Sequence, residues 1–339
     1  MEIQTVVHEL HPRSEFRIAR KRAEPYRNVL LRLERDGVVG WGEASPSPYY
    51  EEKADDVVTA LQRLQEWLRK LPILSVADIE DAWKAGREKH GLTPAAQCAL
   101  DLALWDWVAQ KEGTTVAELA LGQPPRPVTS FATIGLSTAE ELPQKIEELR
   151  GFPRVKIKSD SNADFEPVRR AREELGAEVA VDANCGWENT KIAPLSVALS
   201  AMGVSFIEQP LAPGRDTDLV RASYALPIIA DESCVTEDDF LRVAMYFNGI
   251  NVKLVKCGGL TPALRMLRRA KQHGLRTMVG CMLETSVLIA AGCVAAQIAE
   301  YADLDGAWLT ADDPCKGWHF DRGTLSPPSS LGLGAKPRE

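Results

Sequence analysis

Five charged residues follow one another through the middle of the chain at nearly constant spacing. They are Lys158, Asp182, Glu208, Asp231 and Lys253, and the intervals between them are 24, 26, 23 and 22 residues. Each lies at or near the end of a short apolar run, and each interval has the length of one strand plus one helix. A single charge of this kind is explained as well by a solvated loop. Five in phase predict that all the side chains lie at the carboxyl end of one parallel sheet, where barrel enzymes keep their active sites.

The three acids of this series predict a metal site. Carboxylates that converge from neighbouring strands repel one another and require a cation. Asp182, Glu208 and Asp231 offer only oxygen ligands, which suit a hard divalent ion, and we expect one Mg2+. Asn184 follows Asp182 by two residues and is expected to support the ligands.

The lysines that flank the acids predict proton transfer. Lys156 and Lys158 are two residues apart on a predicted strand, so both should face the barrel interior. Two close ammonium groups lower each other's pKa, which would leave one as a neutral base. Lys253 would enter from the sixth strand, roughly opposite the second. A base on each face of a metal-bound substrate predicts epimerisation or racemisation of a carbon next to a carboxylate, through an enolate that the metal stabilises.

Other polar residues have simpler interpretations. Lys256 competes for the role of Lys253, but it should lie on the opposite strand face and form a surface salt bridge. None of the five histidines falls on the proposed rim. Gly40-Trp41-Gly42 is not followed by a helix as a phosphate loop would be, so a tight strand edge is expected. Trp105 and Trp107 are expected to pack in a core or an interface.

Composition excludes several classes of protein. The chain has 339 residues, a net charge of −8 and 45% hydrophobic residues, which suits a packed core of one large barrel with a cap or of two modest domains. No stretch approaches the roughly 20 apolar residues that span a bilayer. The acidic balance argues against non-specific nucleic-acid binding. Seven scattered cysteines without a CxxC pair, and an N-terminus without an apolar signal core, predict a cytoplasmic protein with reduced thiols.

The elements that would carry these residues change in type along the chain. Residues 27–43 read as a hairpin with Asp36-Gly37 at its turn, and 52–69 and 94–111 read as helices, which is an α+β pattern. A Pro-rich break follows at 122–128. From there eight short apolar runs, the last a weak one near 303–309, alternate with helical segments, as in a (β/α)8 barrel.

The motifs, taken in order, resemble the muconate-lactonising subgroup of the enolase superfamily. They are GWGEASP (40–46), ALDLALWDW (99–107), KIK (156–158), VDANCGW (181–187), IEQP (207–210), ADES (230–233), NVKLVKCGG (251–259), VGCMLETS (279–286) and DLDG (303–306). The resemblance implies a modified barrel, one Mg2+ and a lysine pair. It implies an α+β cap over 1–115, a barrel over 116–310 and a segment 311–339 that returns to the cap. It places acid/base chemistry on Lys158 and Lys253, with Lys156 tuning Lys158.

Within this subgroup the sequence looks most like the dipeptide epimerases of the L-Ala-D/L-Glu type. Their Asp-x-Asp at the end of the eighth strand is matched by Asp303 and Asp305, which could hold the free ammonium of a dipeptide. The alternatives are an N-acylamino-acid racemase, an o-succinylbenzoate synthase or a muconate cycloisomerase, whose substrates bring no ammonium. An inactive barrel used for binding would be expected to have lost the lysines or acids. Asp312-Asp313 is a poorer candidate for the ammonium site because it lies in a Pro-flanked loop.

The substrate side chain is less clearly indicated. In the resembling family a cap loop closes over it, and here that loop would include Arg20, Lys21 and Arg22, which favour an acidic side chain. The family more often has Gly-Thr after the first arginine, so the preference does not transfer directly. Glu284 and Ser286 are expected to contact substrate or its neighbours. The expected partners are a small dipeptide released from murein and further copies of the chain in a homo-oligomer.

Overall fold

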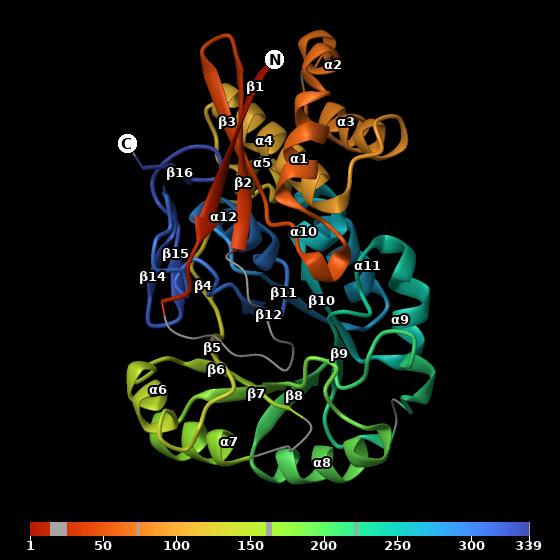
Figure 1. Cartoon of the computed structure of the whole chain (residues 1–339), viewed down its shortest axis with the longest axis vertical. Helices are drawn as coiled ribbons and strands as arrows, with labels where there is room; N and C mark the ends of the chain where they lie inside the picture. The colour runs from red at the N-terminus through yellow and green to blue at the C-terminus, as the bar shows by residue number, and fades with distance from the viewer. Residues whose placement is uncertain (14–25, 73–74, 161–164, 221–222, 339) are drawn as a thin grey trace.

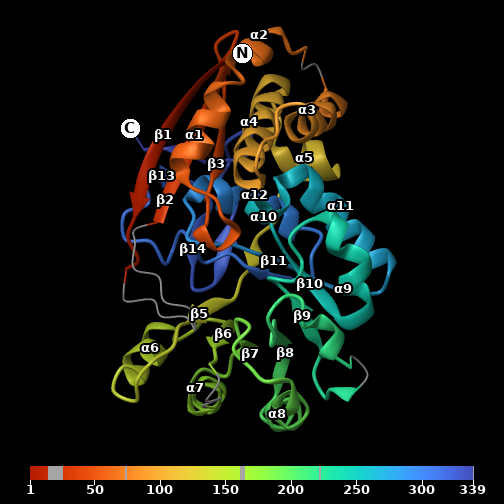
Figure 2. The same cartoon turned by 45° about the vertical axis from the view of Figure 1, so that its right-hand side comes forward.

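The computed structural model describes residues 1–13, 26–72, 75–160, 165–220 and 223–338. A small antiparallel sheet with its helices forms a cap, and an eight-stranded parallel sheet forms a nearly closed barrel beside it (Figure 1). Both views place α6, α7 and α8 on the side of the barrel farthest from the cap (Figures 1 and 2). The predicted fold, a modified (β/α)8 barrel with an α+β cap, is confirmed.

The cap sheet has the order β1 (Glu2–Leu10), β2 (Tyr26–Arg35) and β3 (Val38–Ala44). The predicted hairpin is β2 and β3. Its two-residue turn, Asp36-Gly37, has φ values of 56° and 75°, and positive φ at both positions matches the twist of a tight hairpin. The first strand was not predicted from the sequence.

Five helices accompany this sheet in the described part of the chain. They are α1 (Ala54–Gln62), α2 (Gln65–Lys70), α3 (Val76–Glu88), α4 (Pro94–Glu112) and α5 (Val116–Leu121). The single helix expected over 52–69 is therefore two helices. The predicted helix over 94–111 is α4, in which both Trp105 and Trp107 are buried in the core, as expected.

Gly40 and Gly42 allow α4 to pack directly on β3. A Cβ atom on Gly40 would lie 2.2 Å from the carbonyl oxygen of Ala103, and one on Gly42 would lie 1.9 Å from that of Ala99. Only glycine permits this close approach of helix and strand backbones. The two glycines therefore serve helix–strand packing on an edge strand.

The barrel strands follow one another around the sheet in chain order. They are β5 (Ala132–Ile134), β6 (Arg154–Lys158), β7 (Glu178–Asp182), β8 (Val204–Glu208), β9 (Ile228–Ala230), β10 (Gly249–Lys253), β11 (Arg276–Gly280) and β12 (Tyr301–Asp303). A hydrogen bond of 2.8 Å from the Phe131 amide to the Ala302 carbonyl joins the first and last strands.

Two of the eight predicted strands differ from expectation. The first apolar run divides, because β4 (Val128–Thr129) pairs outside the barrel with β15 (Thr324–Ser326) and only β5 joins it. The eighth strand, expected as a weak run near 303–309, instead ends at Asp303. The chain turns directly afterwards, and the Leu309 amide donates to the Asp305 carbonyl at 2.9 Å.

The remaining helices surround the barrel or close its strand ends. They are α6 (Leu142–Glu148), α7 (Glu166–Arg170), α8 (Asn189–Ala201), α9 (Phe240–Tyr246), α10 (Leu254–Cys257), α11 (Leu260–Gln272) and α12 (Ser286–Ala296). None of the described helices has the length and apolar character needed to cross a bilayer.

The C-terminal segment runs back along the cap. Beyond β13 (Cys315–Lys316) and β14 (His319–Asp321) it ends in β16 (Lys336–Pro337), which pairs with β13. The Leu333 amide donates to the Asp106 carboxylate of α4 at 2.8 Å. The last of these contacts ties the C-terminal segment to α4 of the cap, whereas the domain limits at 115 and 310 stay predictions.

Candidate active site

The regularly spaced charges lie together at the carboxyl end of the barrel. Lys158, Asp182, Glu208 and Lys253 are each the last residue of a strand, and Asp231 directly follows one. The register pairs Lys158 with Asp182 and Asp182 with Glu208. The regular spacing of these residues in the sequence therefore does place their side chains on one rim of the barrel.

An apolar layer supports this charged rim from inside the barrel. Ala180, Phe206 and Ile229 are fully buried and lie two residues before Asp182, Glu208 and Asp231. Residues two apart on a strand point to the same side. The phenyl ring of Phe206 also meets the ring of Tyr301 at 4.9 Å, so the rim is held above a packed aromatic plug.

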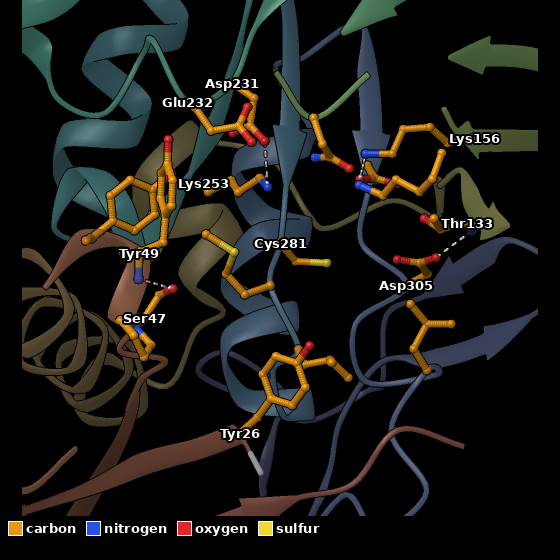
Figure 3. Close-up of a pocket in the computed structure, with 18 residues that line it drawn as sticks. Tyr26, Ser47, Tyr49, Thr133, Lys156, Asp231, Glu232, Lys253, Cys281 and Asp305 are labelled. Atoms are coloured by element: carbon orange, nitrogen blue, oxygen red, sulfur yellow. Dashed lines mark hydrogen bonds and ion pairs between the residues drawn. The ribbon is translucent and has the colours of Figure 1, made fainter. Parts of the chain in front are cut away.

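A pocket of about 420 Å3 opens between this rim and the cap (Figure 3). Barrel strands and the segments after them contribute its charged lining residues: Lys156, Lys158, Asp231, Glu232, Lys253, Asp303 and Asp305. Asn184 also lines it. No histidine is among the described residues that line the pocket, as the sequence predicts.

Lys156 is buried at the centre of the acidic residues. Its Nζ atom lies 2.5 Å from Asp303 Oδ2, 2.9 Å from Glu208 Oε2 and 3.5 Å from Asp182 Oδ2. Burial lowers the pKa of Lys156, but the charges of these three carboxylates outweigh it and hold the pKa well above its usual value. The expectation that the close lysines lower each other's pKa is therefore wrong for Lys156.

Lys158 and Lys253 stand on opposite sides of the pocket. Their strands, β6 and β10, are four places apart in the eight-stranded order, which is half-way around a closed barrel. Figure 3 shows Lys253 across the pocket from Lys156, the neighbour of Lys158 on β6. Lys158 Nζ lies 2.6 Å from Asp182 Oδ2, and Lys253 Nζ lies 2.9 Å from Asp231 Oδ2.

Lys256 is not the surface residue that the sequence suggested. Its side chain is buried, and its Nζ donates to the carbonyl oxygen and to Oδ1 of Asp231, both at 2.6 Å. The prediction assumed that the strand continues past Lys253. Instead α10 begins at Leu254, and its turn brings Lys256 back towards β9. Lys256 therefore holds Asp231, a proposed metal ligand, in place through two hydrogen bonds.

The electrostatics of the three acids fit a site for a cation. Burial and the neighbouring charge of Asp182 together raise the pKa of Glu208 to about 7. Burial acts in the same direction on Asp231, but Lys253 and Lys256 outweigh it and depress the pKa of that carboxyl. The three buried carboxylates can therefore lie close together only because the ammonium groups of neighbouring lysines offset their mutual repulsion.

The donor set also fits a hard divalent ion. The Asn184 backbone amide donates to Asp182 Oδ1 at 2.8 Å, and Asn251 Nδ2 donates to Glu208 Oε1 at 2.7 Å. Asn251 was missed in the sequence, although its place two residues before Lys253 puts it on the same strand face. In the described residues no three acidic, thiol or imidazole side chains are grouped to hold an ion as they stand.

Asp303 and Asp305 both line the pocket. Asp303 Oδ2 is paired with Lys156, whereas its buried Oδ1 has no hydrogen-bond partner among the described residues. Asp305 Oδ2 accepts from the Thr133 amide at 2.7 Å, and burial together with the charge of Asp303 raises the Asp305 pKa to about 7. A cationic ligand group would relieve both features. Asp312 and Asp313 are outside the pocket lining.

Glu284 and Ser286, predicted as substrate contacts, are not among the residues that line the pocket. Glu284 is buried and accepts from the Met282 amide at 2.9 Å, while Ser286 Oγ donates to Asp313 Oδ2 at 2.5 Å. Glu284 therefore shapes the loop that carries Met282. Arg20, Lys21 and Arg22 lie outside the described residues.

The cap contributes a side of the pocket that the sequence did not reveal. Tyr26 and the segment Ser47–Tyr50 line it, and Pro48–Tyr50 form a 3-10 turn in which Ser47 Oγ accepts from the Tyr49 amide at 3.3 Å. The only hint of this surface in the sequence was the pair of adjacent tyrosines, Tyr49 and Tyr50, shortly after a predicted strand. Only the fold shows that this turn faces the barrel rim.

Buried polar contacts hold the cap against the barrel loop 281–285. Glu43 of β3 accepts from the amide and the hydroxyl of Thr285 at 2.9 and 2.6 Å. Asn28 of β2 donates to Glu43 at 2.8 Å and to the Leu283 carbonyl at 3.0 Å. The cap strands therefore fix the loop that carries Met282 and Leu283 into the pocket.

Family models match both parts of the chain. The model described as "Enolase C-terminal domain-like" matches residues 138–339, and the N-terminal domain model of mandelate racemase / muconate lactonizing enzyme matches residues 2–122. Together with the capped barrel and its acid–lysine rim, these matches define an enolase-superfamily protein. The chain belongs to the mandelate racemase / muconate lactonizing enzyme family, as its motifs predicted.

The chain is similar to proteins that act on or bind dipeptides. An L-Ala-D/L-amino acid epimerase of Flavobacterium johnsoniae is 36% identical over 327 residues, which cover 94% of each chain. A dipeptide epimerase of Methylococcus capsulatus, solved with Mg and the dipeptide L-Arg-D-Lys, is 32% identical, with a TM-score of 0.89 and 98% of each chain covered. An enolase family member of Agrobacterium tumefaciens, solved with sodium and L-Ala-L-Glu, is 32% identical, with a TM-score of 0.86 and coverage of 96% of this chain and 97% of its own.

Proposed function

We propose that the protein is a Mg2+-dependent dipeptide epimerase that inverts the α-carbon of the second residue. The observation that carries this proposal is the placement of Lys158 and Lys253 on strands half-way around the barrel from each other, with three buried carboxylates between them. The relatives that act on dipeptides support the same class of reaction.

Asp182, Glu208 and Asp231 would hold the Mg2+, with Asn184 and Asn251 orienting their carboxylates. When bound, the ion supplies positive charge that stabilises negative charge developing on the substrate carboxylate. Lys156 carries a further positive charge next to Glu208 and Asp303. This arrangement favours a substrate whose carboxylate gains charge during the reaction.

Lys158 and Lys253 would exchange the proton of the α-carbon. One lysine takes the proton from one face, and the other returns a proton to the opposite face, so that the configuration inverts. Because the two lysines face opposite sides of the α-carbon, each acts as the base for one diastereomer and as the acid when the other diastereomer reacts. The reaction in the reverse direction uses the same two groups with their roles exchanged.

Asp303 and Asp305 would bind the free ammonium of the dipeptide. The partnerless Oδ1 of Asp303 and the raised pKa of Asp305 support this role, because an ammonium group would give the first a donor and the second a counter-charge. The substrates of an N-acylamino-acid racemase, an o-succinylbenzoate synthase or a muconate cycloisomerase bring no ammonium group, and would leave Asp303 Oδ1 and Asp305 without a cationic partner. An inactive binding protein would have no need to retain the buried lysines.

The proposal is tested by α-proton exchange in D2O. Proton NMR of L-Ala-L-Xaa dipeptides with enzyme and Mg2+ should show loss of the second residue's α-proton signal and appearance of the L,D diastereomer. The Asp182→Ala variant should lose this exchange and also the rise in melting temperature that Mg2+ causes in the parent protein. Exchange in N-acylated amino acids but in no dipeptide would contradict the proposal.

Three wider expectations remain predictions of the sequence. They are a cytoplasmic location, self-association into a homo-oligomer, and murein peptides as the source of the substrate. Size-exclusion chromatography with light scattering tests the second of these directly.

A further inference from the structure

The two sides of the pocket differ in chemical character. Every charged residue that lines it among the described residues comes from the barrel. Other described lining residues form a surface that we call the apolar wall: Tyr26, Pro48, Tyr49, Tyr50, Met282 and Leu283. The rings of Tyr49 and Tyr50 meet edge to face, with 4.8 Å between their centroids and an interplanar angle of 85°, so the wall is a packed aromatic surface.

Among the described residues, the pocket lining offers no spare positive charge to a substrate side chain. Three lysines line the described pocket, and each already faces a carboxylate at 2.9 Å or less: Lys156 faces Asp303, Lys158 faces Asp182 and Lys253 faces Asp231. Four acids line the same pocket: Asp231, Glu232, Asp303 and Asp305. A side-chain carboxylate placed against the apolar wall would therefore lose water without gaining a partner.

The reaction geometry directs the second side chain towards this wall. The substrate carboxylate belongs beside Asp182, Glu208 and Asp231, and the ammonium belongs beside Asp303 and Asp305. Figure 3 shows Asp305 on one side of the pocket and Tyr49 with Lys253 on the other. With the α-carbon held between the lysines, the remaining direction leads to the cap.

We infer that the enzyme selects dipeptides whose second residue has a large apolar or aromatic side chain, such as leucine, methionine or phenylalanine. This inference rests on the proposed dipeptide epimerase function. Tyr49 is 46% exposed in the structure, and an apolar side chain against it would remove that surface from water. The apolar wall thus acts as the specificity surface of the pocket.

The test measures kcat/KM for a substrate series on the unmodified holoenzyme with Mg2+. We expect L-Ala-L-Phe and L-Ala-L-Leu to exceed L-Ala-L-Glu and L-Ala-L-Lys by about tenfold or more, with L-Ala-L-Ala between them. L-Ala-L-Glu as the best substrate would overturn the inference and assign the preference to the basic residues Arg20, Lys21 and Arg22. Equal values for all substrates would also overturn it. Failure of every dipeptide would contradict the proposed function instead.

Variants of Tyr49 locate the effect. Tyr49→Ala should lower kcat/KM about tenfold for L-Ala-L-Phe, mainly through KM, and less than about twofold for L-Ala-L-Ala. Tyr49→Arg should reduce the discrimination against L-Ala-L-Glu because it adds the missing cation. Leu241→Ala is the matched control, since Leu241 is an apolar residue on α9 with 66% exposure that does not line the pocket. An equal loss for both substrates in Tyr49→Ala would contradict the assignment.

Discussion

The barrel rim and the apolar wall line one pocket and are built in opposite ways. On the rim, charged groups are removed from water: Lys156 is 1% exposed, and its Nζ lies within 3.5 Å of three carboxylates. On the wall, aromatic groups remain partly open to solvent, with Tyr49 at 46%. The rim is fixed by electrostatic contacts within one sheet, whereas the wall depends on how the cap meets the barrel.

This difference separates the chemistry from the choice of substrate. Groups that transfer protons must be held in a fixed relation before the substrate arrives, and neighbouring barrel strands with their apolar plug provide that. A surface that contacts only the substrate side chain can change without disturbing the charged groups of the rim. The predictions that follow test whether the two regions are independent in this sense.

Removal of either central lysine should have the largest effect. Lys158→Ala and Lys253→Ala should each lower the rate of epimerisation by about a thousandfold or more, because each removes one of the two groups that move the proton. The formation of the L,D diastereomer, followed by chromatography, measures the rate. Lys84→Ala, which removes an exposed lysine of α3, should leave it unchanged. Loss of less than tenfold in both variants would contradict the two-lysine mechanism.

Removal of Lys256 should weaken the rim as a structure. Lys256→Met takes from the buried Asp231 one of its two ammonium partners, so the free energy of unfolding should fall by about 3 kcal/mol. Urea denaturation measures this change, which should shrink when Mg2+ is added because the ion replaces the lost charge. The matched Lys84→Met variant breaks only an exposed pair with Glu80 and should cost less than about 1 kcal/mol. A similar cost in both variants would show that Lys256 does not stabilise the rim.

The ammonium site should discriminate free from acylated substrates. Asp305→Asn should reduce kcat/KM for dipeptides by about 10- to 100-fold, the effect of a lost hydrogen bond to a charged group. N-acetyl dipeptides, which are expected to be poor substrates, should not become poorer. Asp312→Asn changes a partly exposed carboxylate that is paired with His11 away from the pocket and serves as control. An equal loss for free and acetylated dipeptides would remove Asp305 from this role.

The last prediction concerns the pH dependence of the buried carboxyl behind the wall. Burial raises the pKa of Glu284 to about 8, from an ordinary value of 4.5, with a further contribution from Glu43. The native state therefore holds a proton that the unfolded chain releases, and stability from this group is full below about pH 4.5 and is lost as the pH rises to 8. In the parent protein the free energy of unfolding should fall by up to about 1.4 kcal/mol per pH unit across this range, and Glu284→Gln should remove this fall.

Denaturation curves at pH 5.5, 7 and 8.5 measure this prediction. The advantage of Glu284→Gln over the parent protein should grow across this range. Glu88→Gln, at the exposed end of α3, provides a control for the loss of one acidic residue. A difference between Glu284→Gln and its parent that does not change with pH would show that Glu284 is ionised in the folded protein.

The rim was predictable from the sequence because its order is periodic. Strand ends recur once per repeat, so Lys158, Asp182, Glu208, Asp231 and Lys253 could be placed at one end of a barrel from their spacing alone. Lys256 was misplaced because periodicity does not reveal where a strand gives way to a helix. The eighth strand was placed too late because its three residues, Tyr301–Asp303, are too few to show a pattern.

The wall could not be predicted because it is made by contacts between residues far apart in the chain. Asn28 reaches the Leu283 carbonyl across 255 residues, and Trp83 Nε1 donates to the Gly258 carbonyl across 175. Such contacts bring Tyr49 and Met282 to one surface, although neither residue belongs to a repeat. The sequence consequently allowed the reacting groups of the rim to be predicted but not the surface that would contact the substrate side chain.

The most direct test of the account is isotope exchange in the two lysine variants, starting from separate L,L and L,D diastereomers of one dipeptide in D2O with Mg2+. One variant should exchange the α-proton of only the L,L form and the other that of only the L,D form, because each retains the base on one face. Neither variant should interconvert the two forms. Exchange of both diastereomers by the same single-lysine variant would contradict the assignment of Lys158 and Lys253 to opposite faces.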